Sequence, residues 1–261
     1  LLVVLVMAMA VFHFAKPICL RYMTVEDFNR RRNIWAFLTI TAFVSPSFWV
    51  YALFALPVMY KVGRKDSNPV ALYLLLFHVI PPLHYPIPAV LVNEIFDLDN
   101  YRLLAFGLLV PVAWSLIAEK RSHNKSLALA DFYLAAYLIL QILLLAPYEN
   151  ITNTMRRGFL FFLDTTVLFY VICRICADRK KLVEAIAAFT LSCAIFVPVA
   201  VFEQFRSWLL YAGLVDVWGG GTLTSYLFRG DSLRAQASTG HSLVLGYFLA
   251  LALVFWLFFS A

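Results

Sequence analysis

The sequence predicts an all-α, polytopic membrane protein with about seven to nine transmembrane helices. Of its 261 residues, 63% are hydrophobic and only 14% are charged, and mean hydropathy is +0.82. A soluble domain carries roughly a quarter charged residues. Long apolar runs alternate with short polar segments, and a hydrocarbon core about 30 Å thick needs about 20 apolar residues per helix. We therefore expect a lipid bilayer to surround most of this chain.

The two ends of the chain are apolar. The first run, LLVVLVMAMAVFHFA, has no basic segment before it and no small-residue cleavage site after it, which favours a transmembrane helix over a signal peptide. Because the first residue is Leu1 and not methionine, we expect the chain to be a fragment of a longer membrane protein. Residues 1–261 are predicted to form a single transmembrane helical domain.

The apolar run over residues 34–60 has a turn signal, Ser45-Pro46-Ser47, at its middle and basic residues on both flanks. A hairpin of two half-length helices that turns at Ser45-Pro46 keeps both basic flanks on one side of the membrane. One kinked span is the alternative, because proline also bends tilted helices. The other predicted spans are 1–15, 70–80, 101–118, 126–146, 159–177, 182–202 and 243–261.

The basic residues orient these spans. The segments 16–33, 61–68, 119–125 and 178–181 contain 14 of the 21 lysines and arginines, including every lysine. Segments that carry more Lys and Arg face the cytoplasm, so residues 83–100, 147–158 and 203–242 are predicted to face outward. This bias accounts for most of the net charge of +6. No nucleic-acid partner is predicted.

All the basic residues of the outward segments are arginines: Arg156, Arg157, Arg206, Arg229 and Arg234. A guanidinium group offers a planar fork that matches phosphate oxygens, whereas lysine acts as a point charge. Headgroup anchoring is the alternative, and it suffices for the first two. We predict that the other three, led by Arg234, bind a phosphorylated substrate.

The stretch RAQASTGHSLVLGYFLALAL, residues 234–253, contains Arg234, Ser238-Thr239-Gly240, His241 and Gly246 in a recognisable order. It resembles the segment that opens the central helix of the O-antigen ligase and polysaccharide polymerase family, which are bacterial membrane glycosyltransferases. Ser242 stands where that family often has a proline. The resemblance is specific over residues 229–250 and loose over the rest of the chain.

The resemblance implies a GT-C-like helical membrane glycosyltransferase fold in the bacterial inner membrane, with the active face in the periplasm. The donor would be an undecaprenyl-diphosphate-linked glycan, and the acceptor another glycan (polymerase) or lipid A-core (ligase). Arg234 occupies the position of the motif arginine and would bind the diphosphate. Interfacial arginines can stabilise that leaving group, so no cofactor and no metal are predicted. The general base of the family would lie beyond Ala261, so no catalytic residue is assigned.

Four residues are predicted to support the site. Glu203, at the outer end of its span, is positioned to orient an arginine such as Arg234. His241 starts a helix, where capping or headgroup contact is favoured over catalysis. Asp164 lies about one turn inside its span, where Arg157 or the neighbouring Arg156 would form a structural ion pair with it; substrate binding is the alternative.

A second function class stays open at this point: a non-enzymatic polysaccharide or lipid transporter or assembly protein. Such transporters typically show internal repeats and broken helices near the membrane midplane. The sequence has no evident repeat, and its outward arginines lie near one face. These features favour the glycosyltransferase.

Overall fold

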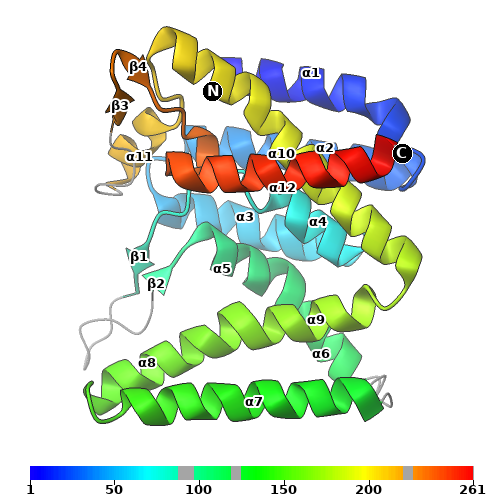
Figure 1. Cartoon of the computed structure of the whole chain (residues 1–261), viewed down its shortest axis with the longest axis vertical. Helices are drawn as coiled ribbons and strands as arrows, with labels where there is room; N and C mark the ends of the chain where they lie inside the picture. The colour runs from blue at the N-terminus through cyan, green and yellow to red at the C-terminus, as the bar shows by residue number, and fades with distance from the viewer. Residues whose placement is uncertain (88–96, 119–124, 220–225, 261) are drawn as a thin grey trace.

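The computed structural model describes residues 1–87, 97–118, 125–219 and 226–260. It is 77% helical, in agreement with the nearly all-α prediction. The helices run side by side along one direction, from α1 at one edge of the molecule to α7 at the other, and the connections gather at two ends (Figure 1). The helices are α1 (Leu2–Cys19), α2 (Val25–Val44), α3 (Phe48–Gly63), α4 (Pro69–Leu76), α5 (Asn100–Leu104), α6 (Val110–Ala118), α7 (Lys125–Leu145), α8 (Ile151–Phe161), α9 (Leu168–Ile175), α10 (Arg179–Arg206), α11 (Ala212–Trp218) and α12 (Ser242–Ser260).

Six helical segments of the described chain are long and apolar enough to cross a membrane, which indicates a multi-pass membrane protein. They are Leu2–Cys19, Asn100–Ala118, Leu127–Leu145, Ile151–Ile175, Arg179–Arg206 and Ser242–Phe259. Length and hydropathy alone therefore do not support a count of seven to nine. Helix α3 has 16 residues and α4 has 8, and the first half of α2 is polar.

The hairpin prediction for residues 34–60 is confirmed. Helix α2 ends at Val44, and Ser47 caps α3 by accepting the Val50 N–H at 3.4 Å. The ion pair between Arg31 in α2 and Asp66 after α3 brings the two far ends of the hairpin together. The half-length expectation is wrong, because α2 begins at Val25, inside the segment predicted as a polar loop.

A buried polar node holds the end of this hairpin against α10. Arg31 is 1% exposed; its Nε and Nη2 donate to the two carboxylate oxygens of Asp66 at 3.0 and 2.6 Å. Its Nη2 also lies 2.8 Å from Glu184 Oε1. Asn68 Nδ2 donates to Glu184 Oε2 at 3.0 Å. A buried guanidinium group is tolerated only when paired in this way, so the node fixes α2, the α3–α4 connection and α10 relative to one another.

An aromatic cluster fixes the opposite end of the hairpin. The rings of Phe48 and Tyr85 stack with centroids 4.4 Å apart, and Trp218 packs edge-on against both. Trp218 Nε1 donates to Ser45 O at 2.9 Å, and the Tyr85 hydroxyl donates to Trp218 O at 3.1 Å. Buried Trp and Tyr are stable when their polar atoms find such partners. The cluster joins the α2–α3 turn to α11 and to strand β1 (Tyr85–Pro86), which pairs antiparallel with β2 (Asp97–Leu98).

Two long helices contain π-helical segments, η1 (Ala105–Leu109) between α5 and α6 and η2 (Phe162–Val167) between α8 and α9. Helix η1 packs closely on α3, because a Cβ at Gly107 would lie 3.0 Å from Met59 Cβ. The helix that contains the predicted span 159–177 starts earlier than predicted, since α8 begins at Ile151 and contains Arg157.

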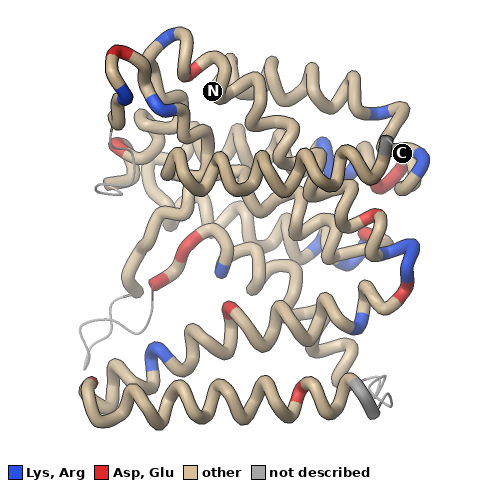
Figure 2. The backbone as a smooth tube through the Cα atoms, viewed as in Figure 1, with Lys and Arg blue, Asp and Glu red and all other residues tan. Residues whose placement is uncertain are grey.

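Charged residues concentrate at the two ends of the helix stack (Figure 2). The lysines at the end of α1, the end of α3 and the start of α10 share one end, here called the lysine end. The opposite end contains β1, β2, α11 and the β3–β4 hairpin described below, and is called the hairpin end. In the described ranges, the predicted cytoplasmic segments at the ends of α1 and α3 and the start of α10 thus lie at the other end from the folded part of the predicted outward segment 203–242. The predicted cytoplasmic residues 119–124 lie outside the described residues.

Candidate functional site

The predicted outward loop 203–242 is largely folded. It contains α11, strands β3 (Phe228–Arg229) and β4 (Ser232–Leu233) and a 3₁₀ turn η4 (Ala237–Thr239). The strands form a two-residue hairpin in which Phe228 pairs with Leu233 and Arg229 pairs with Ser232. Gly230 occupies the turn with φ of +60°, a conformation that glycine adopts at little cost.

The hairpin presents two of the predicted arginines on the same face. Side chains alternate across a strand, so residues 228 and 233 share one face, and Arg229 shares the other with its cross-strand partner Ser232. The Arg234 N–H donates to Leu227 O at 2.8 Å, which extends the pairing and puts Arg234 on the Arg229 face, diagonally across. Both arginines are exposed.

The opposite face of the hairpin anchors it. Leu233 is fully buried and packs with Leu209 and Ala212 in a small apolar cluster apart from the main core. Arg206, the third predicted arginine, is the last residue of α10 and is also exposed. Basic positions lie around the end of α10 and the β3–β4 hairpin at one corner of the molecule (Figure 2). Within the described residues, none of the three arginines is recorded in an ion pair.

Glu203 has a different role from the predicted one of orienting Arg234. Its carboxylate, fully buried, accepts three backbone N–H groups: Leu210 at 3.0 Å on Oε1, and Gln236 and Ala237 at 2.9 and 2.8 Å on Oε2. Ala237 has φ of +48°, in the left-handed region, so two successive amides converge on one oxygen. The expected contact with Arg234 is therefore replaced by an anchor that holds both ends of the segment to α10.

The rest of the motif is structural in this arrangement. Ser238 Oγ donates to His78 O at 2.6 Å, and Thr239 Oγ1 donates to Gln236 O at 2.7 Å. The exposed His241 accepts the Leu243 N–H on Nδ1 at 3.2 Å and so caps the start of α12. These contacts fix the path from Arg234 into α12.

Asp164 has a partner that sequence reasoning missed. Arg102 Nη2 lies 2.8 Å from Asp164 Oδ2, and Arg102 Nη1 donates to Asp97 O at 2.6 Å. The predicted pairing with Arg156 or Arg157 is wrong for Arg157, which instead lies 3.0 Å from Glu149. Arg102 lies inside the predicted span 101–118, where an unpaired charge is costly. The sequence therefore indicated that Arg102 needs an acidic partner.

This ion pair borders a polar cluster at the hairpin end. Asp99 caps α5 by accepting the Arg102 N–H at 2.8 Å, and His84 Nδ1 lies 3.7 Å from Asp99 Oδ2. Burial raises the pKa of the Asp99 carboxyl above its ordinary value. The local charge is acidic, because Asp97, Asp99 and Asp164 outnumber Arg102.

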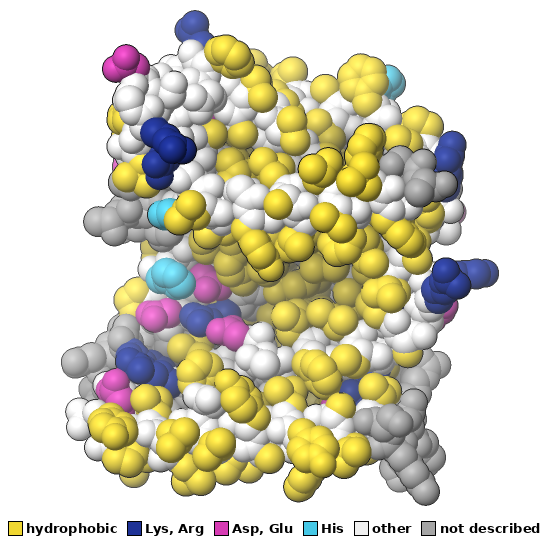
Figure 3. All heavy atoms as spheres, viewed as in Figure 1, with side chains coloured by type: hydrophobic (Ala, Val, Ile, Leu, Met, Phe, Trp, Pro, Cys, Tyr) yellow, Lys and Arg dark blue, Asp and Glu magenta, His cyan; other side chains and the backbone are white. Residues whose placement is uncertain are grey.

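A cavity of about 260 Å³ lies beside the polar cluster. The rings of Phe77 and Tyr101 stack in its wall with centroids 4.1 Å apart. Its lining is otherwise apolar apart from two carboxylates and consists of Tyr73, Phe77, Asp99, Tyr101, Ala105, Leu163, Asp164 and Leu168. Figure 3 shows a hollow with apolar walls beneath α12, and acidic, basic and histidine side chains border its hairpin end.

No group of three or more metal-ligating side chains is found among the described residues. The arrangement offers an exposed pair of arginines on a fixed hairpin, and an acidic cluster at the mouth of an apolar hollow. Comparisons with protein-family models, curated proteins and solved structures find no match to this chain.

Proposed function

We propose that this chain is part of a bacterial inner-membrane glycosyltransferase that acts on a glycan linked to undecaprenyl diphosphate. In this proposal the hairpin end faces the periplasm, and Arg229 and Arg234 bind the diphosphate, assisted by Arg206. The observation that supports it best is the shared exposed face of Arg229 and Arg234 on an anchored hairpin.

The chemistry of glycan transfer requires positive charge next to the diphosphate. The bond from the sugar to the diphosphate breaks, and negative charge develops on the leaving oxygen. Two guanidinium forks stabilise that charge most when they are fixed before the reaction, because no reorganisation is then needed. The three backbone N–H groups that donate to the Glu203 carboxylate, and the buried Leu233, supply this fixation.

The hollow beneath α12 suits the lipid part of the donor. Its apolar walls can contact a polyprenyl chain, whereas the carboxylates of Asp99 and Asp164 at its mouth repel a diphosphate. Charge therefore favours the β3–β4 hairpin for the diphosphate and leaves the hollow for hydrocarbon. The GT-C-like fold and the larger number of spans belong to this same proposal.

The acceptor is another lipid-linked glycan in a polymerase, or lipid A-core in a ligase, and both fit the donor site equally. The competing function is a transporter or assembly protein without enzymatic activity. A transporter would move the lipid-linked glycan without forming a glycosidic bond. The two functions therefore differ in the covalent product.

The test is Arg234→Ala in cells that make the polysaccharide, with Arg21→Ala as the matched control. Arg21 is also exposed but lies at the lysine end. We expect Arg234→Ala to abolish polymer or ligated glycan on a gel while membrane insertion is unchanged. Arg234→Lys should recover little, because the planar fork is lost. Normal glycan chains in Arg234→Ala would contradict the diphosphate assignment.

A reconstituted assay separates the enzyme from the transporter. Proteoliposomes that contain the purified full-length protein and a lipid-linked glycan donor should yield a new glycosidic product and free undecaprenyl diphosphate when an acceptor is supplied. Movement of the donor across the bilayer without such a product would favour the transporter.

A further inference from the structure

A second cavity, of about 500 Å³, lies at the lysine end and is separate from the site above. It opens between the end of α3, helix α6, the end of α9 and the start of α10. Its lining comprises Tyr60, Gly63, Arg64, Asp66, Pro69, Gly107, Leu108, Pro111, Val112, Trp114, Ser115, Leu116, Ile175 and Lys181. We call it the lysine-end cavity.

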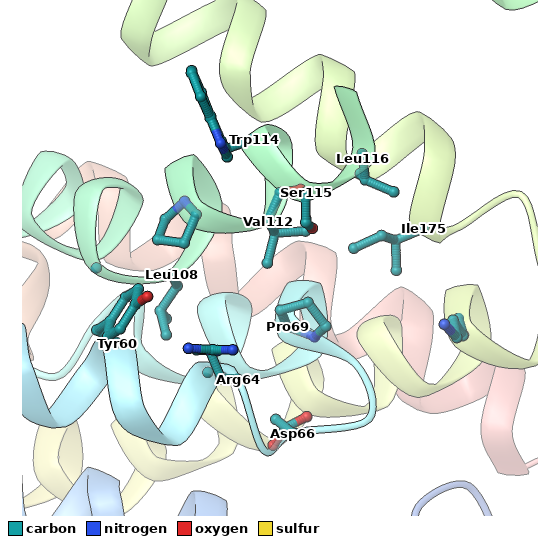
Figure 4. A pocket seen from close by; sticks show the side chains of 14 residues that line it. Tyr60, Arg64, Asp66, Pro69, Leu108, Val112, Trp114, Ser115, Leu116 and Ile175 are labelled. Carbon is teal, nitrogen blue, oxygen red and sulfur yellow. The ribbon is translucent and has the colours of Figure 1, made fainter. Parts of the chain in front are cut away.

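Two cationic side chains line this cavity and form no ion pair with a described carboxylate. Arg64 projects its guanidinium group between Tyr60 and Pro69 (Figure 4), and Lys181 lines the cavity from α10. Asp66 is already held by Arg31, and its side chain has no exposed surface. In the described parts of the chain, neither Arg64 nor Lys181 is recorded in an ion pair. The cavity thus has two positive charges available to a ligand.

The wall on the α6 side is apolar and is exposed at the surface of the molecule. Trp114 lines the cavity and is 76% exposed, and Ile117, on the same helix, is 59% exposed. These residues lie in the Asn100–Ala118 segment, which is long and apolar enough to span a membrane. The lining of the cavity therefore combines two cations with a hydrocarbon-compatible surface.

We propose that the lysine-end cavity binds the headgroup of an anionic phospholipid. In this proposal the cations that line the cavity, Arg64 and Lys181, attract the anionic headgroup, and the acyl chains follow the exposed face of α6 past Trp114. Basic pockets between transmembrane helices at the cytoplasmic side commonly bind anionic headgroups, and guanidinium forks match phosphate oxygens. This site takes a bulk membrane lipid and does not depend on the glycosyltransferase proposal.

Native mass spectrometry of the detergent-purified chain tests this proposal with three added ligands: phosphatidylglycerol, phosphatidylcholine with the same acyl chains, and inorganic phosphate. We expect the wild type to retain phosphatidylglycerol about 30-fold more strongly than phosphatidylcholine, since each of the two basic residues attracts anionic lipid by about 1 kcal/mol. Arg64→Gln with Lys181→Gln should remove that preference. The matched control is Lys61→Gln with Lys65→Gln, which removes two exposed cations from the same end without touching the cavity lining.

Three outcomes would overturn the proposal. Equal retention of the two lipids by the wild type would show no anionic headgroup site. If the control variant lost the preference for phosphatidylglycerol to the same extent, the preference would be due to general surface charge. Displacement of phosphatidylglycerol by millimolar inorganic phosphate would assign the cavity to a soluble anion. If the double variant does not fold, Arg64→Gln alone should lower the preference about fivefold, and no change in it would count against the site.

Discussion

Replacing Glu203 by alanine should release the outer segment from α10 without unfolding the helix stack. The substitution removes the acceptor of three backbone N–H groups, those of Leu210, Gln236 and Ala237. The three residues are at most 9% exposed, so their amides cannot regain full hydration while the segment stays folded. The main core, which lies between α1, α2, α3, α4 and α10, does not use this carboxylate.

The size of the effect follows from the number of bonds. A hydrogen bond to a charged group contributes about 1.5 kcal/mol at the lower end of its range, so three contribute about 4.5 kcal/mol. Each 1.4 kcal/mol is a tenfold change in an equilibrium. Amide hydrogen exchange should therefore become roughly 10³-fold faster at the three amides in Glu203→Ala. Glu203→Gln keeps one acceptor oxygen, so with its amide oxygen in the Oε2 position only the Leu210 amide should lose protection.

Hydrogen exchange followed by mass spectrometry measures both variants, and Gln204→Ala is the matched control because Gln204 is adjacent and exposed. Unchanged exchange at the three amides in Glu203→Ala would refute the anchoring role. Faster exchange throughout α1 and α4 would also refute it, because the carboxylate would then support the whole fold.

Three further outcomes are expected from thermal unfolding in detergent. Arg31→Ala should lower stability by about 3–5 kcal/mol, because it leaves buried carboxylates unpaired, whereas Arg32→Ala should change it by less than about 0.5 kcal/mol; similar losses would contradict the buried node. Gly107→Ala should cost about 1–3 kcal/mol through overpacking against α3, but Gly213→Ala, with open space around it, should cost nothing. Because burial raises the pKa of Asp99, its favourable contribution is present below about pH 4 and is lost as pH rises through the raised value. Asp99→Asn should therefore be more stable than wild type at pH 7 and equal to it below pH 4, and a difference of opposite sign would contradict the cause.

Local signals in the sequence predicted much of the architecture. The Ser45-Pro46-Ser47 turn predicted the α2–α3 hairpin, and the lysine distribution predicted which connections share an end. The turn signal depends on three adjacent residues, and the lysine signal depends on the composition of whole segments, so neither requires knowledge of which helices become neighbours. Length and hydropathy alone support six spans in the described chain, because α3 has 16 residues and α4 has 8. The larger predicted number therefore stays a prediction.

Partners distant in sequence could not be predicted. Asp164 pairs with Arg102, 62 residues away, whereas Arg157 pairs with Glu149, because η1, which continues α5, packs on η2. Glu203 looked like a partner for a cation, but it accepts amides 33 and 34 residues further along. Spacing alone could not distinguish these choices, since each depends on which helices become neighbours.

The buried node around Arg31 also has a consequence for assembly during synthesis. Asn68 and Glu184, which complete the node, are separated by 116 residues. At a synthesis rate of about 5–20 residues per second, Glu184 is made roughly ten seconds after Asp66. During that interval the α2–α3 hairpin is held by a partial ion pair and has no α10 to shield it. The first quarter of the chain thus reaches its final electrostatic balance only when α10 has been synthesised.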